Sequence, residues 1–299
     1  MFYKMDTKTV YNHITKLLET RPNVTRPDIV VEASDAAGID DFLPCFSSPD
    51  TTDDGDLVNR WVVVGGKRYL YKGAGDTYLQ QPYNELIVTK LMHRLNVPCV
   101  EYTVHCIDGR VYSVCENMLS EGQELISAWQ IYLTSKKSPD ISRFEHFLNC
   151  AEKLGIPGVR AFLDRMIVID YIIGNEDRHF SNFAAIRNTK TKKWISMAPL
   201  FDAGSTFGYC HSAEELRQNR PIRCLCFAPT HEEQLTFVSD FSWIDFSALD
   251  DFKALIYEVL SDENTKKTVG EDRIQLIVQQ AEDRVRNLKE FVKAKQTVG

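Results

Sequence analysis

Short runs of β-branched and aromatic residues, separated by turn signals, fill much of the stretch between residues 60 and 118. Such runs are typical of antiparallel strands. Residues 60–71 hold two of them around Gly65-Gly66, and residues 100–118 hold two more around Asp108-Gly109. Two-residue turns of this composition join the strands of β-hairpins. The pattern therefore predicts two hairpins, with Lys72 at the end of a strand of the first.

Apolar residues that recur every three or four positions predict helices in the rest of the chain. One such helix, over residues 84–95, separates the two hairpins. The composition changes near residue 120, and longer helical patterns follow at 141–154, 159–173 and 274–292. The fold class that we expect is α+β, with a small β-rich N-lobe and a larger α-helical C-lobe.

These patterns divide the chain into three parts. Residues 1–44 begin with a short helical pattern, but the sequence does not indicate their role. Residues 45–119 form the small lobe and residues 120–299 the large one. The small lobe starts with the run C-F-S-S-P-D-T-T-D-D-G-D at 45–56, which is acidic and rich in turn-forming residues. We expect a loop there.

Composition and charge narrow the possible classes of function. Hydrophobic residues make up 43% and charged residues 26% of the 299 residues, as in ordinary globular proteins. The formal net charge of −7 provides no overall positive field for a polyanion, so we expect no direct binding of nucleic acid. Neither a signal-peptide pattern nor a run of about 18 uncharged apolar residues occurs. We expect a cytoplasmic protein that does not bind membranes.

The eight cysteines contain no C-x-x-C pair, and most lie in apolar runs. We expect buried thiols in a reducing compartment. The close pair Cys224 and Cys226 has no second pair at the spacing of zinc ligands, which argues against a zinc site.

Three polar residues follow the apolar pattern at 159–173 and are candidates for chemistry. Asp177 and Asn182 lie in the segment that leaves this pattern, and Asp202 comes after a turn and a short strand. Phosphoryl transfer uses this set: one carboxylate orients the acceptor hydroxyl, while an amide oxygen and a second carboxylate hold Mg²⁺. Each residue alone also fits a helix cap, but their joint occurrence favours a kinase.

The small lobe contains matching candidates for nucleotide binding. Lys72 at a strand end can reach the α- and β-phosphates of ATP, and Glu85 on the next helix can fix its ammonium group. The alternative for Lys72 is a solvated edge charge. The segment at 115–119 crosses between the lobes, where a kinase backbone meets adenine, so Glu116 and Met118 are the expected hinge contacts. Their side chains can equally serve packing.

These residues resemble the HipA-like kinases, bacterial serine/threonine kinases that include toxins of toxin–antitoxin modules. The resemblance covers roughly residues 45–295. It rests on Y-L-Y-K-G at Lys72, N-E at 84–85, I-D-Y-I-I-G-N-E-D-R-H-F-S-N-F around Asp177, A-P-L-F-D-A-G-S around Asp202, and H-E-E-Q-L at 231–235. It implies a two-lobed protein-kinase-like fold, ATP and Mg²⁺ as cofactors, a protein substrate, and a possible antitoxin partner.

The resemblance also assigns roles. Lys72 contacts the phosphates, Asp177 is the catalytic base, Asn182 and Asp202 bind Mg²⁺, and by position Glu85 is the partner of the lysine. Residues 1–44 have no counterpart, and the chain resembles a compact form of the family that lacks its extra N-terminal subdomain.

The loop at 45–56 occupies the place of the phosphate-covering loop of kinases, so we expect Ser47, Ser48 and Gly55 to contact the nucleotide. It departs from the glycine-rich loop of ordinary protein kinases, because Gly55 is its only glycine. Relatives carry an autophosphorylated serine there, which makes Ser47, Ser48, Thr51 and Thr52 candidates for modification. An ordinary solvated loop is the alternative. Two other functions stay open: a phosphoinositide or lipid kinase, which shares the D-R-H-x-x-N spacing, and a catalytically inactive nucleotide-binding module.

Overall fold

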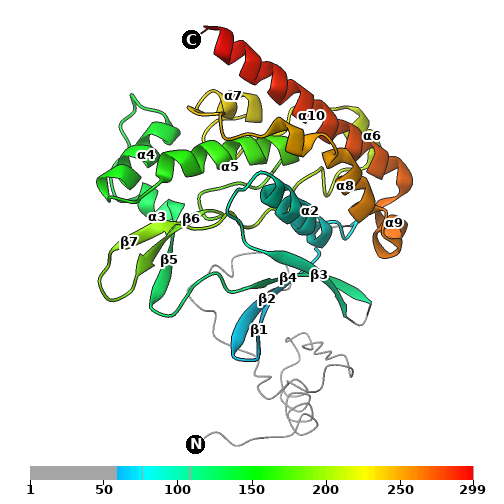
Figure 1. Cartoon of the computed structure of the whole chain (residues 1–299), viewed down its shortest axis with the longest axis horizontal. Coiled ribbons are helices and arrows are strands. Elements are labelled where there is room, and N and C mark those ends of the chain that lie inside the picture. The colour runs from blue at the N-terminus through cyan, green and yellow to red at the C-terminus, as the bar shows by residue number, and fades with distance from the viewer. Residues whose placement is uncertain (1–58, 76, 108, 299) are drawn as a thin grey trace, which may run out of the picture.

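The computed structural model describes residues 59–75, 77–107 and 109–298. In this part of the chain, a four-stranded antiparallel sheet and one helix form a small lobe, and a larger lobe above it is mainly helical (Figure 1). The expected α+β fold with two lobes is confirmed. The helix expected near the N-terminus and the loop at 45–56 lie outside the described residues.

The four-stranded sheet contains both predicted hairpins, and its strand order is β1-β2-β4-β3. Gly65 and Gly66 turn the first hairpin with φ of 55° and 75°, a left-handed conformation that glycine adopts at no steric cost. Lys72 is the last but one residue of its strand, opposite Ser113. The strands are β1 (Asn59–Val64), β2 (Lys67–Gly73), β3 (Tyr102–Ile107) and β4 (Arg110–Glu116).

Helix α2 (Gln81–Arg94) packs against β3 and β4 of this sheet. It begins three residues earlier than the predicted start at residue 84. Pro82 lies in its first turn, where a missing N–H costs no helical hydrogen bond. The helix ends as predicted ahead of Asn96, whose φ is 52°.

A second, three-stranded sheet of order β5-β6-β7 lies in the larger lobe. It consists of β5 (Gln123–Ser127), β6 (Ala184–Asn188) and β7 (Trp194–Met197). The sequence indicated only the short strand near residue 194, and helical patterns were expected from residue 120. The five residues of β5 are all half-buried, and its partner β6 lies about sixty residues further along the chain. The local sequence therefore shows no alternating pattern that would predict this strand.

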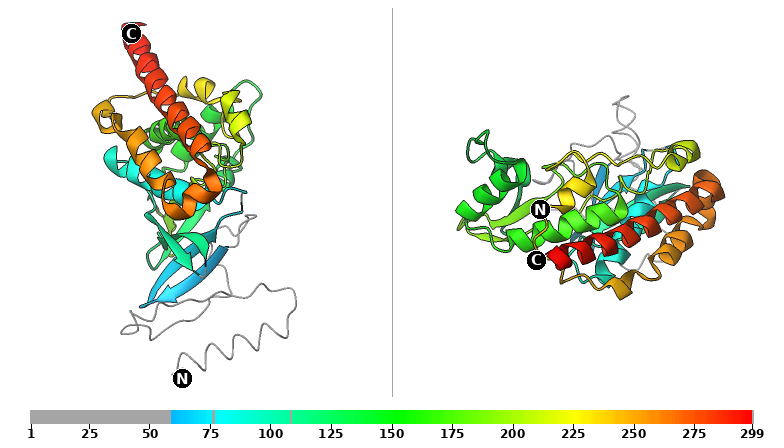
Figure 2. Two further views of the ribbon diagram at one scale, coloured as in Figure 1. Left: turned by 90° about the vertical axis from the view of Figure 1, so that its right-hand side faces the viewer. Right: turned by 90° about the horizontal axis from the view of Figure 1, so that it is seen from above.

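Helix α5 (Val159–Ile173) is the predicted central helix, with the predicted bounds. It lies between glycines of left-handed conformation, Gly158 and Gly174. The long helix α10 (Glu271–Val298) runs beside it and beside α8 (Figures 1 and 2). The other helices are α3 (Ala128–Tyr132), α4 (Arg143–Lys153), α6 (Ala213–Arg217), α7 (His231–Leu235), the 3₁₀-helix η2 (Phe246–Leu249), α8 (Phe252–Leu260) and α9 (Glu263–Val269).

The buried apolar residues form a large cluster and a small one. The large cluster joins α2 to the helices of the larger lobe. The small cluster joins the two sheets and includes Val100 and Cys115 from one lobe and Ile186 and Phe201 from the other. The lobes therefore share apolar contacts beside the segment at 117–122 that connects their sheets.

The prediction that the cysteines are buried thiols is correct for Cys115, Cys150, Cys224 and Cys226. It is wrong for Cys106 and Cys210, which are exposed, and Cys99 is partly exposed. Cys106 lies on the edge strand β3, so a side chain that faces away from the lobe meets solvent. Cys45 lies outside the described residues. None of the described helices is both long enough and apolar enough to cross a bilayer.

Candidate active site

A cavity of about 550 Å³ is lined by residues of both lobes. It brings together most of the candidate residues from the sequence: Lys72, Glu85, Glu116, Met118, Asp177, Asn182 and Asp202. The other candidates, Ser47, Ser48, Thr51, Thr52 and Gly55, lie outside the described residues.

The centre of the cavity is an ion triad that joins the two lobes. Lys72 Nζ donates to Glu85 Oε1 at 2.9 Å and to Asp202 Oδ1 at 2.6 Å. Burial opposes the charge on Lys72, but Asp202 and Glu85 outweigh it, and the pKa of the lysine is raised. The lysine therefore stays charged. It is not the solvated edge charge that the sequence left open, because the residue is only 8% exposed.

Helix α2 also fastens the loop that follows Asp202. Glu85 Oε2 accepts from the backbone N–H of Ala203 at 3.0 Å. The buried amide of Asn84 donates to the carbonyls of Gly204 and Thr206, both at 2.8 Å. Gly204 approaches the helix so closely that a Cβ there would lie 3.4 Å from that of Gln81. The N-E pair at 84–85 thus fixes the backbone next to Asp202.

The loop that carries Asp177 begins where α5 ends at Gly174. Asn175 Nδ2 donates to Asp170 Oδ1, and Asn175 Oδ1 accepts from the backbone N–H of Asp177 at 3.0 Å. Asn182 Nδ2 donates to the carbonyl of Asp177, also at 3.0 Å. These bonds hold the backbone of Asp177 from both sides of the loop.

Arg178 ties this loop to the strand segment before Asp202. Its guanidinium forms a bidentate pair with Asp170, at 2.9 and 3.1 Å, and donates to the carbonyls of Asn182 and Phe201. Burial opposes its charge, but Asp170 outweighs burial and raises the pKa of Arg178. Arg178 therefore forms a buried ion pair with a carboxylate of α5.

The carboxyl group of Asp177 faces the cavity and is about half exposed, at 49%. His179 Nε2 lies 3.9 Å from Asp177 Oδ1. Desolvation raises the pKa of Asp177; His179 opposes this shift, and Asp202 adds to it. A carboxylate of raised pKa next to an open cavity can accept a hydrogen bond, and then a proton, from a bound hydroxyl.

Asn182 and Asp202 offer oxygen ligands of the kind that Mg²⁺ prefers. Because the amide nitrogen of Asn182 is bonded to Asp177, its Oδ1 is the atom that a metal ion can use. Desolvation favours the protonated form of Asp202, but Lys72 outweighs it, and the pKa of Asp202 is lowered. Asp202 therefore remains an anionic ligand, and the residues present fit Mg²⁺.

The cavity also has an apolar wall formed by Leu70, Leu125 and Phe201, with Met118 packed against the same cluster. Such a wall suits a flat aromatic ring. The Glu116 carboxylate pairs with Lys67 at 2.9 Å on the surface. Asn117 fixes the connecting segment, since its N–H donates to the carbonyl of Arg68 at 2.7 Å.

Two buried polar residues near the loop of Asp177 were not singled out from the sequence. Asp170, which pairs with Arg178, is a charge within the nearly apolar stretch I-V-I-D-Y-I-I, and that contrast was the available signal. His231 of the H-E-E-Q-L motif donates from Nε2 to the carbonyl of Asn175 at 3.0 Å. Burial lowers the pKa of this histidine, so it acts as a neutral support of the loop.

A family model described as the HipA-like C-terminal domain matches residues 56–287. This range includes most of both lobes and every residue of the ion triad and of the loop at 175–182. No curated protein sequence matches the chain.

Several solved structures are similar to this chain. The proinflammatory kinase CtkA of Helicobacter pylori is 16% identical, with a TM-score of 0.54 over 77% of this chain and 95% of that one. This likeness shows a kinase fold. HipA of Shewanella oneidensis MR-1, solved with HipB and operator DNA, is 11% identical, with a TM-score of 0.45 over 92% of this chain and 72% of that one. The choline kinase LicA of Streptococcus pneumoniae is 14% identical, with a TM-score of 0.32 over 92% and 99%.

Proposed function

This chain belongs to the HipA-like C-terminal domain family, and on that premise we propose that it is an ATP-dependent serine/threonine protein kinase. The observation that carries the proposal is the meeting of Lys72, Glu85, Asp177, Asn182 and Asp202 at one cavity. We assign residues 45–119 to a nucleotide-binding lobe and residues 120–299 to a catalytic lobe. Residues 1–44 receive no role.

In this proposal the small lobe positions the phosphates of ATP, and residues from both lobes hold its adenine ring. Lys72 binds the α- and β-phosphates, and Glu85 keeps its ammonium group in place through the 2.9 Å ion pair. The apolar wall around Met118 and Phe201 holds the adenine ring, and the backbone at Glu116 and Met118 provides hydrogen bonds to its edge. The described part of the cavity thereby fixes both ends of the nucleotide.

Asn182 and Asp202 would hold Mg²⁺, which neutralises charge on the phosphate oxygens when it is bound. Asp177 binds the hydroxyl of the acceptor serine or threonine, orients its oxygen toward the γ-phosphorus, and accepts its proton. Its raised pKa suits that last step. Arg178 acts at a distance, because it holds the carbonyls of Asn182 and Phe201 and so positions the loop.

The test compares wild-type protein, Asp177→Asn and the surface variant Asp140→Asn with radiolabelled ATP, Mg²⁺ and a bacterial lysate. Asp177→Asn should abolish transfer of label while circular dichroism and nucleotide binding stay near wild type, because the change is nearly isosteric. Asp140 is exposed and is not among the residues that line the cavity, so its variant should retain activity. Near-wild-type turnover of Asp177→Asn would refute the role of Asp177.

The acceptor is identified in the same experiment. Label in protein that is released as phosphoserine or phosphothreonine supports a protein kinase. Label extracted only into lipid would instead show the lipid-kinase alternative, and no transfer by the wild type to any acceptor would favour an inactive nucleotide-binding module. Mass spectrometry of the kinase itself tests whether Ser47, Ser48, Thr51 or Thr52 becomes phosphorylated.

The family resemblance further leads us to propose a toxin role with an antitoxin partner. Expression in bacteria should then inhibit growth, and Asp177→Asn should relieve the inhibition at matched expression. A variant that loses turnover and stays toxic would separate toxicity from the kinase reaction. The expectation that the chain makes no direct contact with nucleic acid stays a prediction, which a binding assay with genomic DNA fragments can check.

A further inference from the structure

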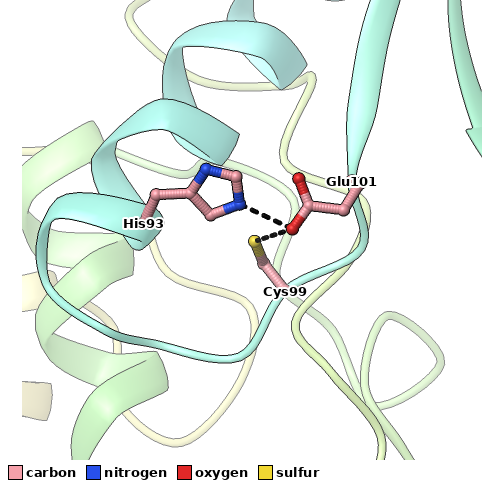
Figure 3. Close-up of side chains that lie close together, drawn as sticks. All are labelled: His93, Cys99 and Glu101. Atoms are coloured by element: carbon pink, nitrogen blue, oxygen red, sulfur yellow. Dashed lines mark hydrogen bonds and ion pairs between the residues drawn. The ribbon is translucent and has the colours of Figure 1, made fainter.

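Three side chains with metal-binding atoms lie together near the C-terminal end of α2, two turns beyond Glu85 (Figure 3). His93 belongs to the last turn of the helix, and Cys99 and Glu101 belong to the segment that leads into β3. In Figure 3 the imidazole and the thiol both point toward the carboxylate. None of the three lines the nucleotide cavity.

The three ligand atoms lie near enough to one another to reach a single cation after small side-chain movements. His93 Nε2 lies 2.5 Å and Cys99 Sγ 4.0 Å from Glu101 Oε1, and all three ligand atoms lie within 4.8 Å of one another. Bond lengths of about 2.0–2.3 Å place the ligand atoms of tetrahedral Zn²⁺ roughly 3.4–3.6 Å apart. The His93–Glu101 contact has to lengthen and the Cys99–Glu101 contact has to shorten. The side chains of His93 and Glu101 are 53% and 64% exposed, so both can rotate.

The backbone that carries Cys99 is fixed. Val100 N–H donates to the carbonyl of Leu200 at 2.8 Å, and the N–H of Leu200 donates to the carbonyl of Pro98 at 3.0 Å. Cys99 sits between these two bonds, in a parallel bridge with Leu200. Val97 N–H bonds to the carbonyl of Met92 at 2.9 Å and closes the segment against α2. Binding of a cation therefore requires the side chains to move, but not the backbone.

The alternative is that His93 and Glu101 form only a surface ion pair. Such a pair would add little to the stability of the fold, and it would not explain why the Cys99 thiol lies beside it. One carboxylate and one thiolate balance the charge of a divalent cation, and the imidazole adds a neutral ligand. Sulfur, nitrogen and oxygen in one set favour Zn²⁺ over Mg²⁺, which takes oxygen ligands.

We propose that His93, Cys99 and Glu101 form a binding site for a divalent cation of the Zn²⁺ class, separate from the nucleotide cavity. A fourth position stays open for water or a further ligand. Binding replaces the proton of the Cys99 thiol, which leaves as H⁺ while sulfur bonds to the metal. The cation links the end of α2 to the segment bonded to Leu200, two residues before Asp202.

The test uses the full chain after treatment with a chelator, in excess Mg²⁺ so that oxygen sites are filled. Zn²⁺ affinity is measured by competition with a chromophoric chelator, and Co²⁺ is added separately to detect the charge-transfer band of a cobalt–thiolate bond. The variants are Cys99→Ser, His93→Gln and Glu101→Gln. The matched control is Cys210→Ser, because Glu176, Cys210 and His211 form the second His/Cys/carboxylate group in the described chain.

Loss of a ligand should weaken Zn²⁺ binding by at least the roughly 10- to 100-fold that loss of an outer-shell partner costs. The cobalt–thiolate band should be present in wild type and Cys210→Ser and absent in Cys99→Ser. Zn²⁺ should raise the melting temperature of wild type but not of Glu101→Gln, whose exposed side chain leaves the packing intact. Binding lost only in Cys210→Ser, or unchanged in all three site variants, would overturn the proposal. A wild-type chain that shows neither band nor binding would overturn it as well.

Discussion

Replacing Asp170 by asparagine tests whether the buried pair with Arg178 holds the loop of Asp177 together. The two side chains are 2% and 3% exposed. Asparagine has nearly the same shape and keeps an oxygen for the amide of Asn175. It removes the negative charge and can accept from only one arm of the guanidinium, so Arg178 is left charged, buried and unbalanced.

The expected loss is large. Removing one partner of a buried ion pair costs about 3–5 kcal/mol, because the remaining charge has no compensation. This is a substantial share of the roughly 5–15 kcal/mol that stabilises a folded protein. For a lobe of this size it corresponds to a fall in melting temperature of roughly 6–20 °C. The pair holds the carbonyls of Asn182 and Phe201 through Arg178, so turnover should fall too.

The assay is denaturant unfolding followed by circular dichroism for wild type, Asp170→Asn, Arg178→Met and the double variant. The double variant contains no unpaired charge, so its loss of stability should be smaller than the sum of the two single losses. Glu282→Gln is the control, because Glu282 pairs with Lys253 at 2.6 Å on the surface, and it should change stability little. A loss under about 1 kcal/mol in Asp170→Asn, or losses that add in the double variant, would refute the reasoning.

Three further predictions concern the cavity and its supports. Asp202→Ala should weaken Mg·ATP binding more than Asp177→Ala, because Asp202 pairs with Lys72 and offers a metal ligand; titration of nucleotide checks this, and wild-type affinity in Asp202→Ala would remove the residue from the metal site. Because desolvation raises the pKa of Asp177, turnover should begin to fall on acidification at a higher pH than an ordinary aspartate dictates; an acidic limb at the usual aspartate pKa in the pH–rate profile would contradict this. Gly174→Ala should lower the melting temperature more than Gly158→Ala. Both glycines have positive φ, but only at residue 174 would a Cβ lie 2.6 Å from Ile222 and 2.7 Å from Arg284. Equal melting temperatures of the two variants would count against this prediction.

The elements that the sequence predicted best are those whose ends carry their own signal. The bounds of α5 agree to the residue, because an apolar run of helical length lies between Gly158 and Gly174, both left-handed. The first hairpin was predicted correctly because the pair Gly65-Gly66 marks its turn. Helix α2 was placed three residues too late, since its polar first turn with Pro82 resembles a loop until its contacts with the other lobe are known.

The three-stranded sheet could not be predicted, because its stabilisation comes from pairing across distant parts of the chain. Ile126 of β5 pairs with Ala185 of β6, and each strand has only five residues. Without its partner, a segment this short has no strong preference for the strand conformation, so its sequence shows no clear periodic pattern.

For the candidate site, the sequence indicated which residues to consider but not what supports them. Asp177, Asn182 and Asp202 were predicted from their types and spacing, and the structure places them at one cavity. Asn84 and Asp170 were not singled out as supports, because an amide or carboxylate can satisfy many partners, and only the folded chain shows which carbonyl or guanidinium it meets.

The fastening of α2 to the loop after Asp202 bears on how small molecules can inhibit this chain. Kinases are commonly controlled through the position of the helix that carries the partner of the lysine. Here an outward swing of α2 would break the Lys72–Glu85 ion pair. At the same time it would break three hydrogen bonds between α2 and the loop after Asp202: one that Glu85 accepts and two that Asn84 donates. A compound that opens space behind the helix must offset all of these losses. Compounds that fit the cavity with α2 in its present position, against Leu70 and Phe201, leave the bonds between α2 and the loop intact. They are the better starting point for inhibitor design.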